Sequence, residues 1–326
     1  LEVSTLGKIT DETKFVGGIT YEKLHGTIGN TSANPTHFDT YRYGGYGQIS
    51  WQADSNNLVV IGGQINKSEN TDSDISPRVA FIHSFNDNWT GKLLIGKAFR
   101  SPFATDLFLN SPSLQGNPDL SPEYIITFDG QLIFAEKDLS AAITLYRSKH
   151  KDLHKRVVIE DTPTFSNSGK VNYRGIEFEF KNRWAQKLEV QLNASYQTNK
   201  DEFGIKDSTY NPNTMIKMGI NYQYSPNLVL GLFNNYFANP TQPDELNIEP
   251  SSLNEKAGSY HLTTANFRYS LTDLFKHSQV SSATVSLLAD NILDKSIYFP
   301  SINRTNVSTL PHHNGRSLTL TLDIVF

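Results

Sequence analysis

The chain has 326 residues, with 29 Lys and Arg against 33 Asp and Glu and a formal net charge of -4. This near-balance argues against a general nucleic-acid binder, which carries a basic excess or a basic stripe. The absence of cysteine excludes a disulfide framework, thiolate metal sites and a cysteine nucleophile. No segment approaches the ~20 consecutive apolar residues that a membrane-spanning helix needs.

Apolar and polar residues alternate one by one along most of the chain, and we count about fifteen such segments. The first segment, around Leu1–Ile9, is weak. The clearest segments follow in order at Tyr124–Phe134, Gly175–Lys181, Leu188–Tyr196, Ile216–Tyr224 and Leu318–Phe326. This alternation places apolar side chains on one face of a strand and polar ones on the other. The segments run about 10–12 residues, the length of a tilted strand that crosses a bilayer.

The connections between these segments alternate between short and long. The short connections are Ala53–Asn57, Asn86–Asn88, Ala135–Asp138, Lys181–Lys187 and Tyr224–Asn227, with Ser270–Gln279 somewhat longer. The long connections are Lys23–Thr40, Ala98–Ser121, Lys149–Val171, Thr198–Asn211, Ala238–Gly258 and Asn291–Asn314. Short turns at one rim and long loops at the other are typical of an outer-membrane β-barrel. A soluble sandwich would have strands of about 5–6 residues, and a propeller would show a fixed repeat.

The fold class that we predict is therefore all-β, an antiparallel transmembrane β-barrel. Single-chain bacterial barrels have an even number of strands. If the last strand ends at the short-turn rim, about fifteen strands place Leu1 near the long-loop rim. We therefore expect that at least one strand is missing before Leu1.

Four motifs occur in the order in which they occur in TonB-dependent outer-membrane receptors, and the chain resembles the barrel of that family over roughly residues 40 to 326. They are the Arg-x-Pro box of Phe99–Pro102, the box of Gly116–Glu123 (GNPDLSPE), the stretch of Asn167–Glu177, and Ala289–Tyr298. The terminal Phe326, with alternating apolar residues before it, is similar to the signal that the outer-membrane assembly machinery reads.

The resemblance implies a 22-stranded barrel with a plugged lumen. Residues 1–326 are then the C-terminal portion of the barrel, with the N-terminal plug domain and the first barrel strands absent. It also implies a receptor of the Gram-negative outer membrane that takes up a scarce ligand, which we expect to be a ferric siderophore. The implied partners are the TonB energy-coupling complex, acting through the missing plug, the ligand, outer-membrane lipid and lipopolysaccharide, and the assembly machinery. Neither a nucleic acid nor a cofactor is implied.

The box residues Arg100, Pro102, Asn117, Pro118 and Glu123 are expected to be structural, because proline cannot donate to a strand ladder and marks where strands end. The same expectation holds for three further family positions, Gly175, Asn291 and Phe326.

We expect the ligand at the mouth formed by the long loops, where cationic and aromatic residues are concentrated. Cations and tyrosine rings attract an anionic ferric chelate through charge and stacking, whereas paired histidines could meet a metal or haem. The candidate ligand-binding residues are His150 and His154 of the predicted basic loop Lys149–Arg156, Tyr41 of another loop, and Arg304, His312 and His313 of the last long loop. Contact with lipopolysaccharide phosphates, or solubility alone, is the alternative role for these residues.

Haem is disfavoured as the ligand. Haem receptors of the family place a histidine between the two boxes, and Ser101–Gly116 contains none. Haem and cobalamin nevertheless stay open as alternative ligands.

No enzyme is expected, and no catalytic or metal-binding residues are assigned. The chain has no Gly-x-Ser-x-Gly motif, and the His-x-x-x-His pair of His150 and His154 lacks the glutamate of the zinc-protease helix.

Two other functions stay open. A passive porin of 14–16 strands would need a constriction loop with charges of both signs, and Ala98–Ser121 holds only Arg100, Asp106 and Asp119. An adhesive or phage-receptor barrel without transport is the third hypothesis.

Overall fold

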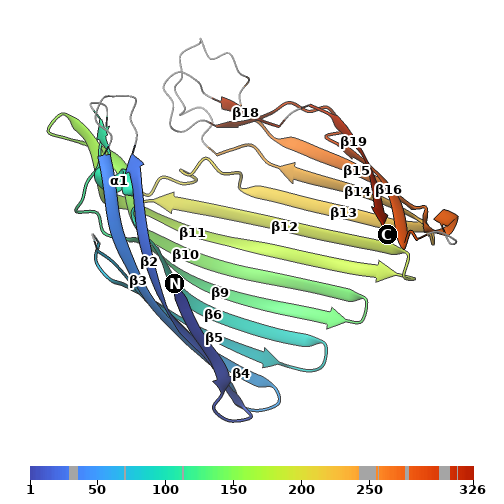
Figure 1. Cartoon of the computed structure of the whole chain (residues 1–326), viewed down its shortest axis with the longest axis horizontal. Coiled ribbons are helices and arrows are strands. Elements are labelled where there is room, and N and C mark those ends of the chain that lie inside the picture. The colour runs from blue at the N-terminus through green and yellow to red at the C-terminus, as the bar shows by residue number, and fades with distance from the viewer. Residues whose placement is uncertain are drawn as a thin grey trace. The chain divides into compact units, whose positions relative to one another are not determined.

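A computed structural model of the protein describes residues 1–28, 36–69, 71–111, 114–241, 255, 257–275, 279–300, 309–313 and 315–326. Fifteen strands form one antiparallel sheet in the order β1-β2-β3-β4-β5-β6-β9-β10-β11-β12-β13-β14-β15-β16-β19 (Figure 1). Their bounds are β1 Glu2–Lys8, β2 Thr13–Ile28, β3 Thr36–Gln52, β4 Asn57–Ser68, β5 Asp74–Ser84, β6 Trp89–Arg100, β9 Glu123–Glu136, β10 Leu139–Ile159, β11 Thr162–Trp184, β12 Leu188–Asp201, β13 Thr214–Ser225, β14 Leu228–Phe237, β15 Tyr260–Ser270, β16 Ser282–Asp290 and β19 Ser317–Val325. The count of about fifteen strands is confirmed, including the weak first one.

The remaining elements are short and lie in connections. A helix, α1, covers Ala104–Phe108, and a 3-10 helix, η1, covers Thr272–Phe275. The strands β7 Asn110–Ser111 and β8 Leu114–Gln115 pair with each other, as do β17 Ile297–Pro300 and β18 Thr309–His313. No helix among the described residues is long and apolar enough to cross a membrane.

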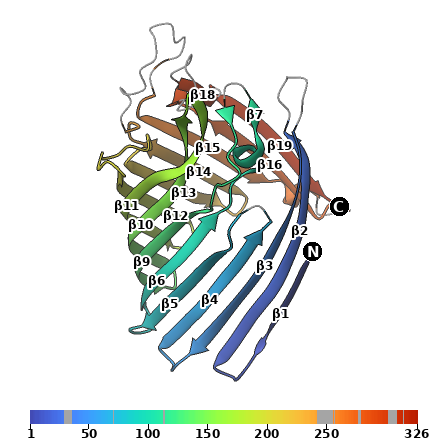
Figure 2. The same cartoon turned by 90° about the vertical axis from the view of Figure 1, so that its left-hand side faces the viewer.

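The chain divides into two compact units. The first comprises Leu1–Leu132, Leu145–Arg174 and Asn199–Ile205, and the second comprises Ile133–Thr144, Gly175–Thr198 and Lys206–Phe326. In the first unit β3, β4, β5 and β6 lie side by side in chain order (Figure 2). In the second unit β13, β14, β15 and β16 do the same.

In the first unit, one face of the sheet carries rows of exposed apolar side chains. Ile49 pairs with Ile61, Ile61 with Val79 and Val79 with Ile95 across four strands. Between 42 and 57% of each of these four residues is exposed, so they are not packed into a core. An exposed apolar band of this kind, on strands long enough to cross a bilayer, is typical of a lipid-facing wall. We call this side the apolar face and the opposite side the polar face.

The second unit repeats the arrangement over five strands. Tyr222, Leu230, Phe267, Leu287 and Leu320 form one cross-strand row, and each is at least 37% exposed. The polar face carries the residues of the other parity. The two faces follow from the period-two pattern of the sequence, because successive side chains of a strand point to opposite faces. The register of the strands then places the apolar residues of neighbouring strands beside one another.

Glycines lie opposite aromatic side chains on neighbouring strands. Gly7 pairs with Phe15, Gly18 with Tyr46, Gly26 with Phe38, and Gly219 with Phe233. A Cβ at any of the four glycines would come within 2.8 Å of the partner's ring or hydroxyl. The rings lie over the bare glycine backbone, a device that compensates for the missing side chain in a strand. These glycines are required for close approach and not for a turn.

The connections alternate as predicted, but the strands reach further at one end. β1 to β2, β3 to β4 and β5 to β6 are joined by tight turns, and the connections that alternate with them include the long segments 101–122, 202–213, 238–259 and 291–316. We call the ends of the strands that meet these segments the long-connection end.

The prediction of a long polar loop over Lys149–Val171 is wrong. β10 runs to Ile159 and β11 starts at Thr162, so the connection is a two-residue turn. β2 and β3 likewise take up most of the predicted loop Lys23–Thr40. Polar residues far along a strand show no apolar alternation, yet their backbones still pair with the neighbouring strand.

Candidate functional site

A buried carboxylate lies at the long-connection end of β9. Glu123 is 1% exposed, and Arg100, the last residue of β6, donates to both of its oxygens, from Nε at 3.0 Å and from Nη2 at 2.5 Å. The backbone N–H of His154 donates to Oε1 at 2.7 Å. Burial alone would raise the pKa of Glu123, but these donors and their positive charge hold it below its usual range. The two boxes of the sequence therefore meet in one bidentate ion pair.

The two predicted histidines of β10 lie against this carboxylate and not in a solvated loop. His154 has a side chain that is 2% exposed, and its Nε2 donates to the carbonyl of Ser121 at 2.8 Å. Its Nδ1 lies 3.5 Å from Glu123 and 3.7 Å from the carboxylate of Asp106. His150 is closer to the surface, with Nε2 at 3.4 Å from Glu123. His154 is thus part of the packing beneath the connection and is not presented to a ligand.

Asparagines attach the connection 101–122 to the β10–β11 hairpin. Asn117 donates from Nδ2 to the carbonyl of Phe165 at 2.9 Å and accepts from the N–H of Asp119 at 2.9 Å. Asn167 donates from Nδ2 to the carbonyl of Ser121 at 2.8 Å, and its Oδ1 accepts the N–H of Ser121 at 2.9 Å. These contacts between backbone and amide support the structural role that the sequence predicts for the second box.

The remaining box residues differ in how closely they are packed. A Cβ at Gly116 would come within 2.7 Å of the backbone of Leu107 and Leu109, so only glycine fits there. Pro102 is buried, whereas Pro118 is exposed.

A buried asparagine forms hydrogen bonds within the turn that follows β16. Asn291 is 0% exposed and has a φ of 48°. Its side chain donates to the carbonyl of Lys295 at 2.9 Å and accepts the N–H of Lys295 at 3.0 Å. Asn291 therefore closes the turn after β16 through its side-chain amide.

The side chain of His313 contacts a carboxylate next to this turn. Its Nε2 lies 3.0 Å from Asp290 Oδ2, and Thr264 donates to the same carboxylate at 2.7 Å. The Thr264 hydroxyl holds the pKa of Asp290 below its usual range, against the effect of burial and together with the Asn291 N–H and His313. The Asp290 carboxylate of β16 thus contacts β18 through His313 and β15 through Thr264.

Aromatic rings stack beside His312. The imidazole of His312 lies over the ring of Phe299, with centroids 3.7 Å apart and planes at 16°. Phe299 is 6.5 Å from Tyr260, which stacks on Phe237 at 4.9 Å and 20°. The rings come from β14, β15 and the β17–β18 pair.

A cavity of about 310 Å³ lies at these rings, and we call it the aromatic cavity. Its lining includes Tyr210, Met215, Phe237, Tyr260, Tyr298 and Phe299. No Lys, Arg, Asp or Glu is among the described residues that line it. The sequence analysis selected His312 but missed this cavity, because its rings are spread along the chain from Tyr210 to Phe299.

The other predicted residues lie elsewhere. Tyr41 stacks on Tyr21 with centroids 6.1 Å apart, and its parity in β3 is that of Tyr43 and Ile49 on the apolar face. Its position is that of an interfacial aromatic residue and does not support its prediction as a ligand contact. Gly175 lies inside β11, and Phe326 is 85% exposed after β19. Arg304 lies outside the described residues.

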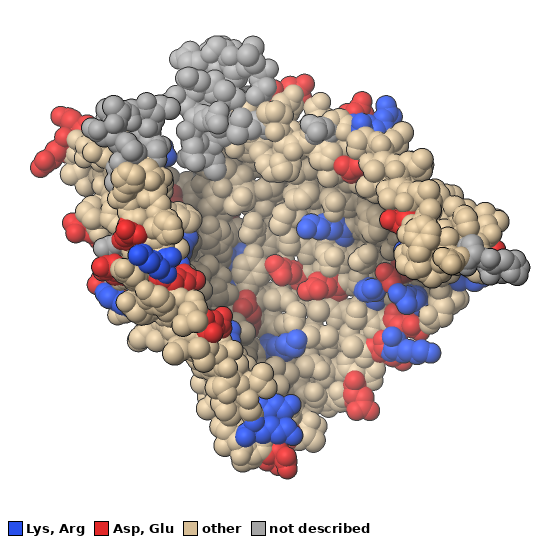
Figure 3. Space-filling view, in the orientation of Figure 1, with Lys and Arg blue, Asp and Glu red and all other residues tan. Residues whose placement is uncertain are grey.

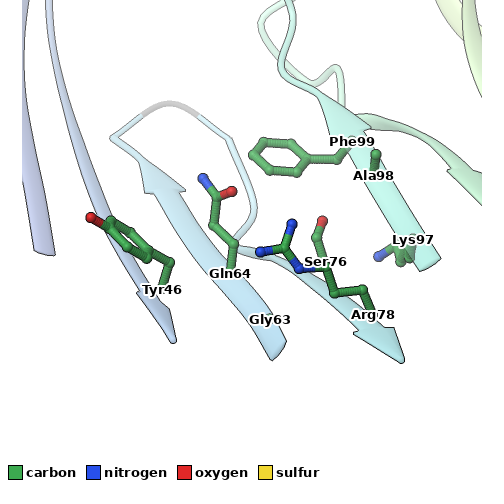
Figure 4. A pocket seen from close by; sticks show the side chains of 8 residues that line it. All are labelled: Tyr46, Gly63, Gln64, Ser76, Arg78, Lys97, Ala98 and Phe99. Carbon is green, nitrogen blue, oxygen red and sulfur yellow. The ribbon is translucent and has the colours of Figure 1, made fainter. Parts of the chain in front are cut away.

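A second cavity, of about 350 Å³, opens on strands β3 to β6 in the first unit. Its lining includes Tyr46, Gln64, Arg78 and Phe99, and in Figure 4 the Arg78 guanidinium and the Phe99 ring point toward Gln64. Arg78 donates from Nη2 to Gln48 at 2.6 Å. In contrast to the aromatic cavity, this one presents a guanidinium. In the face shown in Figure 3, basic and acidic residues are interspersed.

The fold and the alternating faces together define an antiparallel transmembrane β-barrel protein, as the sequence predicts. Residues 4–292 match the family described as "TonB dependent receptor-like, beta-barrel". The chain therefore belongs to this family, whose members are transporters of the Gram-negative outer membrane and not enzymes. Among curated proteins, none matches the sequence.

Solved structures of the family share the fold. The siderophore receptor PirA from Pseudomonas aeruginosa is 16% identical with a TM-score of 0.70, and the match covers 98% of this chain and 53% of PirA. A mutant of the ferric enterobactin receptor PfeA from Pseudomonas aeruginosa, in complex with enterobactin, is 12% identical with a TM-score of 0.74, covering 98% and 53%. The copper transporter OprC is 16% identical with a TM-score of 0.72, covering 97% and 54%. The chain thus spans about half the length of these structures.

Proposed function

We propose that the chain is the ligand-binding barrel wall of an outer-membrane receptor that imports a ferric siderophore. Membership of the TonB-dependent receptor family carries the transport part of this proposal. The stacked imidazole and aromatic rings around His312 and Phe299, at the long-connection end, support a chelate as the ligand, because rings stack on the ligand's own rings.

The proposal includes the rest of the receptor. Residues 1–326 would be the C-terminal portion of a 22-stranded barrel, with a plug domain encoded before them. The plug would transmit the pull of the TonB energy-coupling complex. The chain itself performs no chemistry in this scheme, and lipopolysaccharide surrounds its outer end.

Uptake of radioactive iron tests the proposal against a passive pore. The gene that encodes this chain, with its natural flanking sequence, is expressed in a strain that lacks its own siderophore receptors. Uptake of an iron-55 chelate should then exceed that of the empty strain and should stop when a protonophore collapses the proton gradient. Uptake that continues with the protonophore would favour a passive porin. The absence of uptake for every ferric chelate would refute the proposal that the ligand is a ferric siderophore.

Alanine variants of His312, His313 and Arg304 test whether these residues bind the ligand at the mouth formed by the long loops. Loss of affinity is expected at His312, whose ring is exposed and stacked. Chelate affinity that is unchanged in all three variants would remove these residues from the proposed site. Glu22→Ala is a suitable control, since its partly exposed pair with Arg42 lies in the other unit.

A further inference from the structure

We propose that the cavity on strands β3 to β6 binds one carboxylate group through the guanidinium of Arg78. We call it the arginine cavity, and its lining includes Tyr46, Gln64, Ser76 and Arg78. All of its lining residues lie within the segment Leu1–Leu132 of the first unit. The inference goes beyond the proposed function, because it concerns a separate site and does not depend on which ligand is imported.

Arg78 has a glycine on each side of it in the sheet. Its cross-strand row consists of Gln48, Gly62, Arg78 and Gly96. This row directly follows the apolar row of Ile49 along the strands, so it lies on the polar face. A Cβ at Gly62 would lie 3.3 Å from Arg78 Nε and 2.9 Å from a backbone oxygen. The guanidinium therefore occupies space that is open only because the backbone beside it carries no side chain.

The guanidinium of Arg78 has no acidic partner among the residues that the structure describes. Its Nη2 donates to the neutral amide of Gln48 at 2.6 Å, which leaves the donors on Nε and Nη1. The carboxylate of Asp74 is already paired with Lys97 at 2.6 Å and accepts the Ser76 hydroxyl at 3.0 Å. The described part of the cavity thus holds one positive charge that no anion balances.

A carboxylate matches both this charge and this geometry. A guanidinium binds a carboxylate or a phosphate through two parallel N–H bonds. A monovalent carboxylate balances the single charge, whereas a phosphate dianion would add negative charge beside Asp74 and beside Glu2, which accepts the Tyr46 hydroxyl at 2.6 Å. In Figure 4 the guanidinium points toward Gln64. This amide donates one hydrogen to Asn66 at 2.9 Å, so its other N–H is available to the bound group.

The arginine cavity has room for a carboxylate with a small group behind it. Its volume is about 350 Å³, whereas benzene occupies a cavity of about 150 Å³. The ring of Phe99 is one wall and offers an aromatic face for packing. Benzoate, which is a carboxylate on one phenyl ring, is therefore a suitable probe. Benzamide has nearly the same shape and carries no charge.

Two sources can supply the carboxylate. One is a dissolved acid that reaches the polar face. The other is an aspartate or glutamate side chain from a part of the natural gene product outside residues 1–326. The matched structures are about twice as long as this chain, so both sources are tested.

The first experiment couples the site to its partner. The Arg78→Lys variant of the natural gene product is purified in detergent and treated with a carbodiimide, which joins an amine and a contacting carboxylate as an amide. The reaction is run with and without millimolar benzoate, and mass spectrometry identifies the product at position 78. A benzoyl amide on the introduced lysine assigns the site to a dissolved acid. A cross-link to an acidic side chain outside residues 1–326 assigns it to that segment.

Lys217 is the matched control amine. It is exposed on the polar face of β13, and its cross-strand neighbours are the neutral residues Asn193 and Asn235. The lysine introduced at position 78 should give at least five times as much product as Lys217. Folding of each variant is checked by the shift between unheated and heated protein on a denaturing gel.

A second substitution fills the cavity from its floor. In Gly96→Leu the new Cβ would meet its nearest atom, Arg78 Cβ, at 3.6 Å, which is an ordinary contact. Combined with Arg78→Lys, this substitution should lower the yield of either product at least fivefold. Coupling at Lys217 should stay within twofold.

The second experiment keeps Arg78 and begins with the unaltered protein. Phenylglyoxal modifies accessible guanidinium groups, and mass spectrometry follows the rate at Arg78. If a dissolved acid occupies the site, benzoate should slow this reaction at least fivefold and benzamide less than twofold. If a side chain occupies it, the reaction should be slow without any addition. Replacement of that aspartate or glutamate by its amide should then raise the rate at least fivefold.

The proposal is overturned by any of four results on the folded protein. The introduced lysine gives no more product than Lys217. It couples only to Asp74 or Glu2, the acids already present near the cavity. Arg78 reacts rapidly with phenylglyoxal whether or not benzoate is present. Benzamide slows that reaction as much as benzoate does.

Discussion

Replacing Glu123 by glutamine should destabilise the protein by about 2 kcal/mol. The glutamine oxygen can take the place of Oε1, which accepts from Arg100 Nη2 and from the His154 N–H. The glutamine NH₂ then faces Arg100 Nε, so one charge-assisted hydrogen bond is lost, at a cost of about 1.5–3 kcal/mol.

The loss should stay below the full cost of breaking a buried ion pair, which is about 3–5 kcal/mol. Arg100 explains the difference, because its side chain is 48% exposed and can turn toward water. Glu123→Ala should reach the larger value, since it leaves the buried His154 N–H without its acceptor.

Urea unfolding in detergent, followed by the gel shift of the folded form, measures these changes. The matched control is Glu22→Gln in the same unit, which breaks a glutamate–arginine pair of 3.2 Å whose side chains are 51 and 39% exposed. Exposed pairs contribute about 0–1 kcal/mol. If Glu123→Gln costs no more than Glu22→Gln, the argument that burial makes this pair valuable is refuted.

The pH dependence follows from the lowered pKa of Glu123. The folded state keeps the carboxylate charged at a pH where the unfolded state has already taken up a proton. Its contribution is therefore fully present above the ordinary glutamate pKa of about 4.3 and is lost as the pH falls through the lower, folded-state value. The stability gap between the unaltered protein and Glu123→Gln should be constant from pH 6 to 8 and should shrink below about pH 4.

Three further predictions can be checked by the same unfolding assay. Gly18→Ala should cost about 1–3 kcal/mol, because its Cβ would lie 2.6 Å from a tyrosine hydroxyl. Gly47→Ala should be neutral, because the nearest atom to its Cβ would be 4.0 Å away. Equal losses of stability in the two variants would contradict the role of glycine–aromatic pairing. Leu232→Arg should cost about 2–4 kcal/mol on the apolar face, whereas Asn235→Arg on the polar face of the same strand should cost under about 1 kcal/mol; the reverse order would mean that the faces are assigned wrongly. Asn291→Ala should cost about 1–3 kcal/mol, because it removes the side-chain partner of two part-buried backbone groups of Lys295, and a loss below about 0.5 kcal/mol would show that the turn after β16 does not depend on this amide.

The sequence alone was enough to predict the strands, their number and their faces. Side chains of a strand alternate between faces whatever its neighbours are, so Leu188–Tyr196 and Leu318–Phe326 could be interpreted locally. The family motifs could likewise be identified from short stretches of sequence. The ion pair between Arg100 and Glu123 joins two of these motifs in the folded protein.

The ends of the strands and the surroundings of the candidate residues depended on tertiary structure. The segment from Lys149 to Arg156 has the composition of a solvated loop, but pairing of β10 with β11 draws it into the sheet. A backbone ladder satisfies N–H and C=O groups without regard to side-chain polarity, so composition does not indicate where such a ladder stops.

The aromatic cavity shows the same limit for function. Tyr210, Phe237, Tyr260 and Phe299 occur in four separate segments, and none of these segments by itself suggests a binding site. They meet because antiparallel strands bring the ends of β14 and β15 together and because the β17–β18 pair lies against them. Period-two alternation determines which face a residue takes, whereas contacts between distant segments decide which residues share a cavity, and those contacts arise only when the sheet has formed.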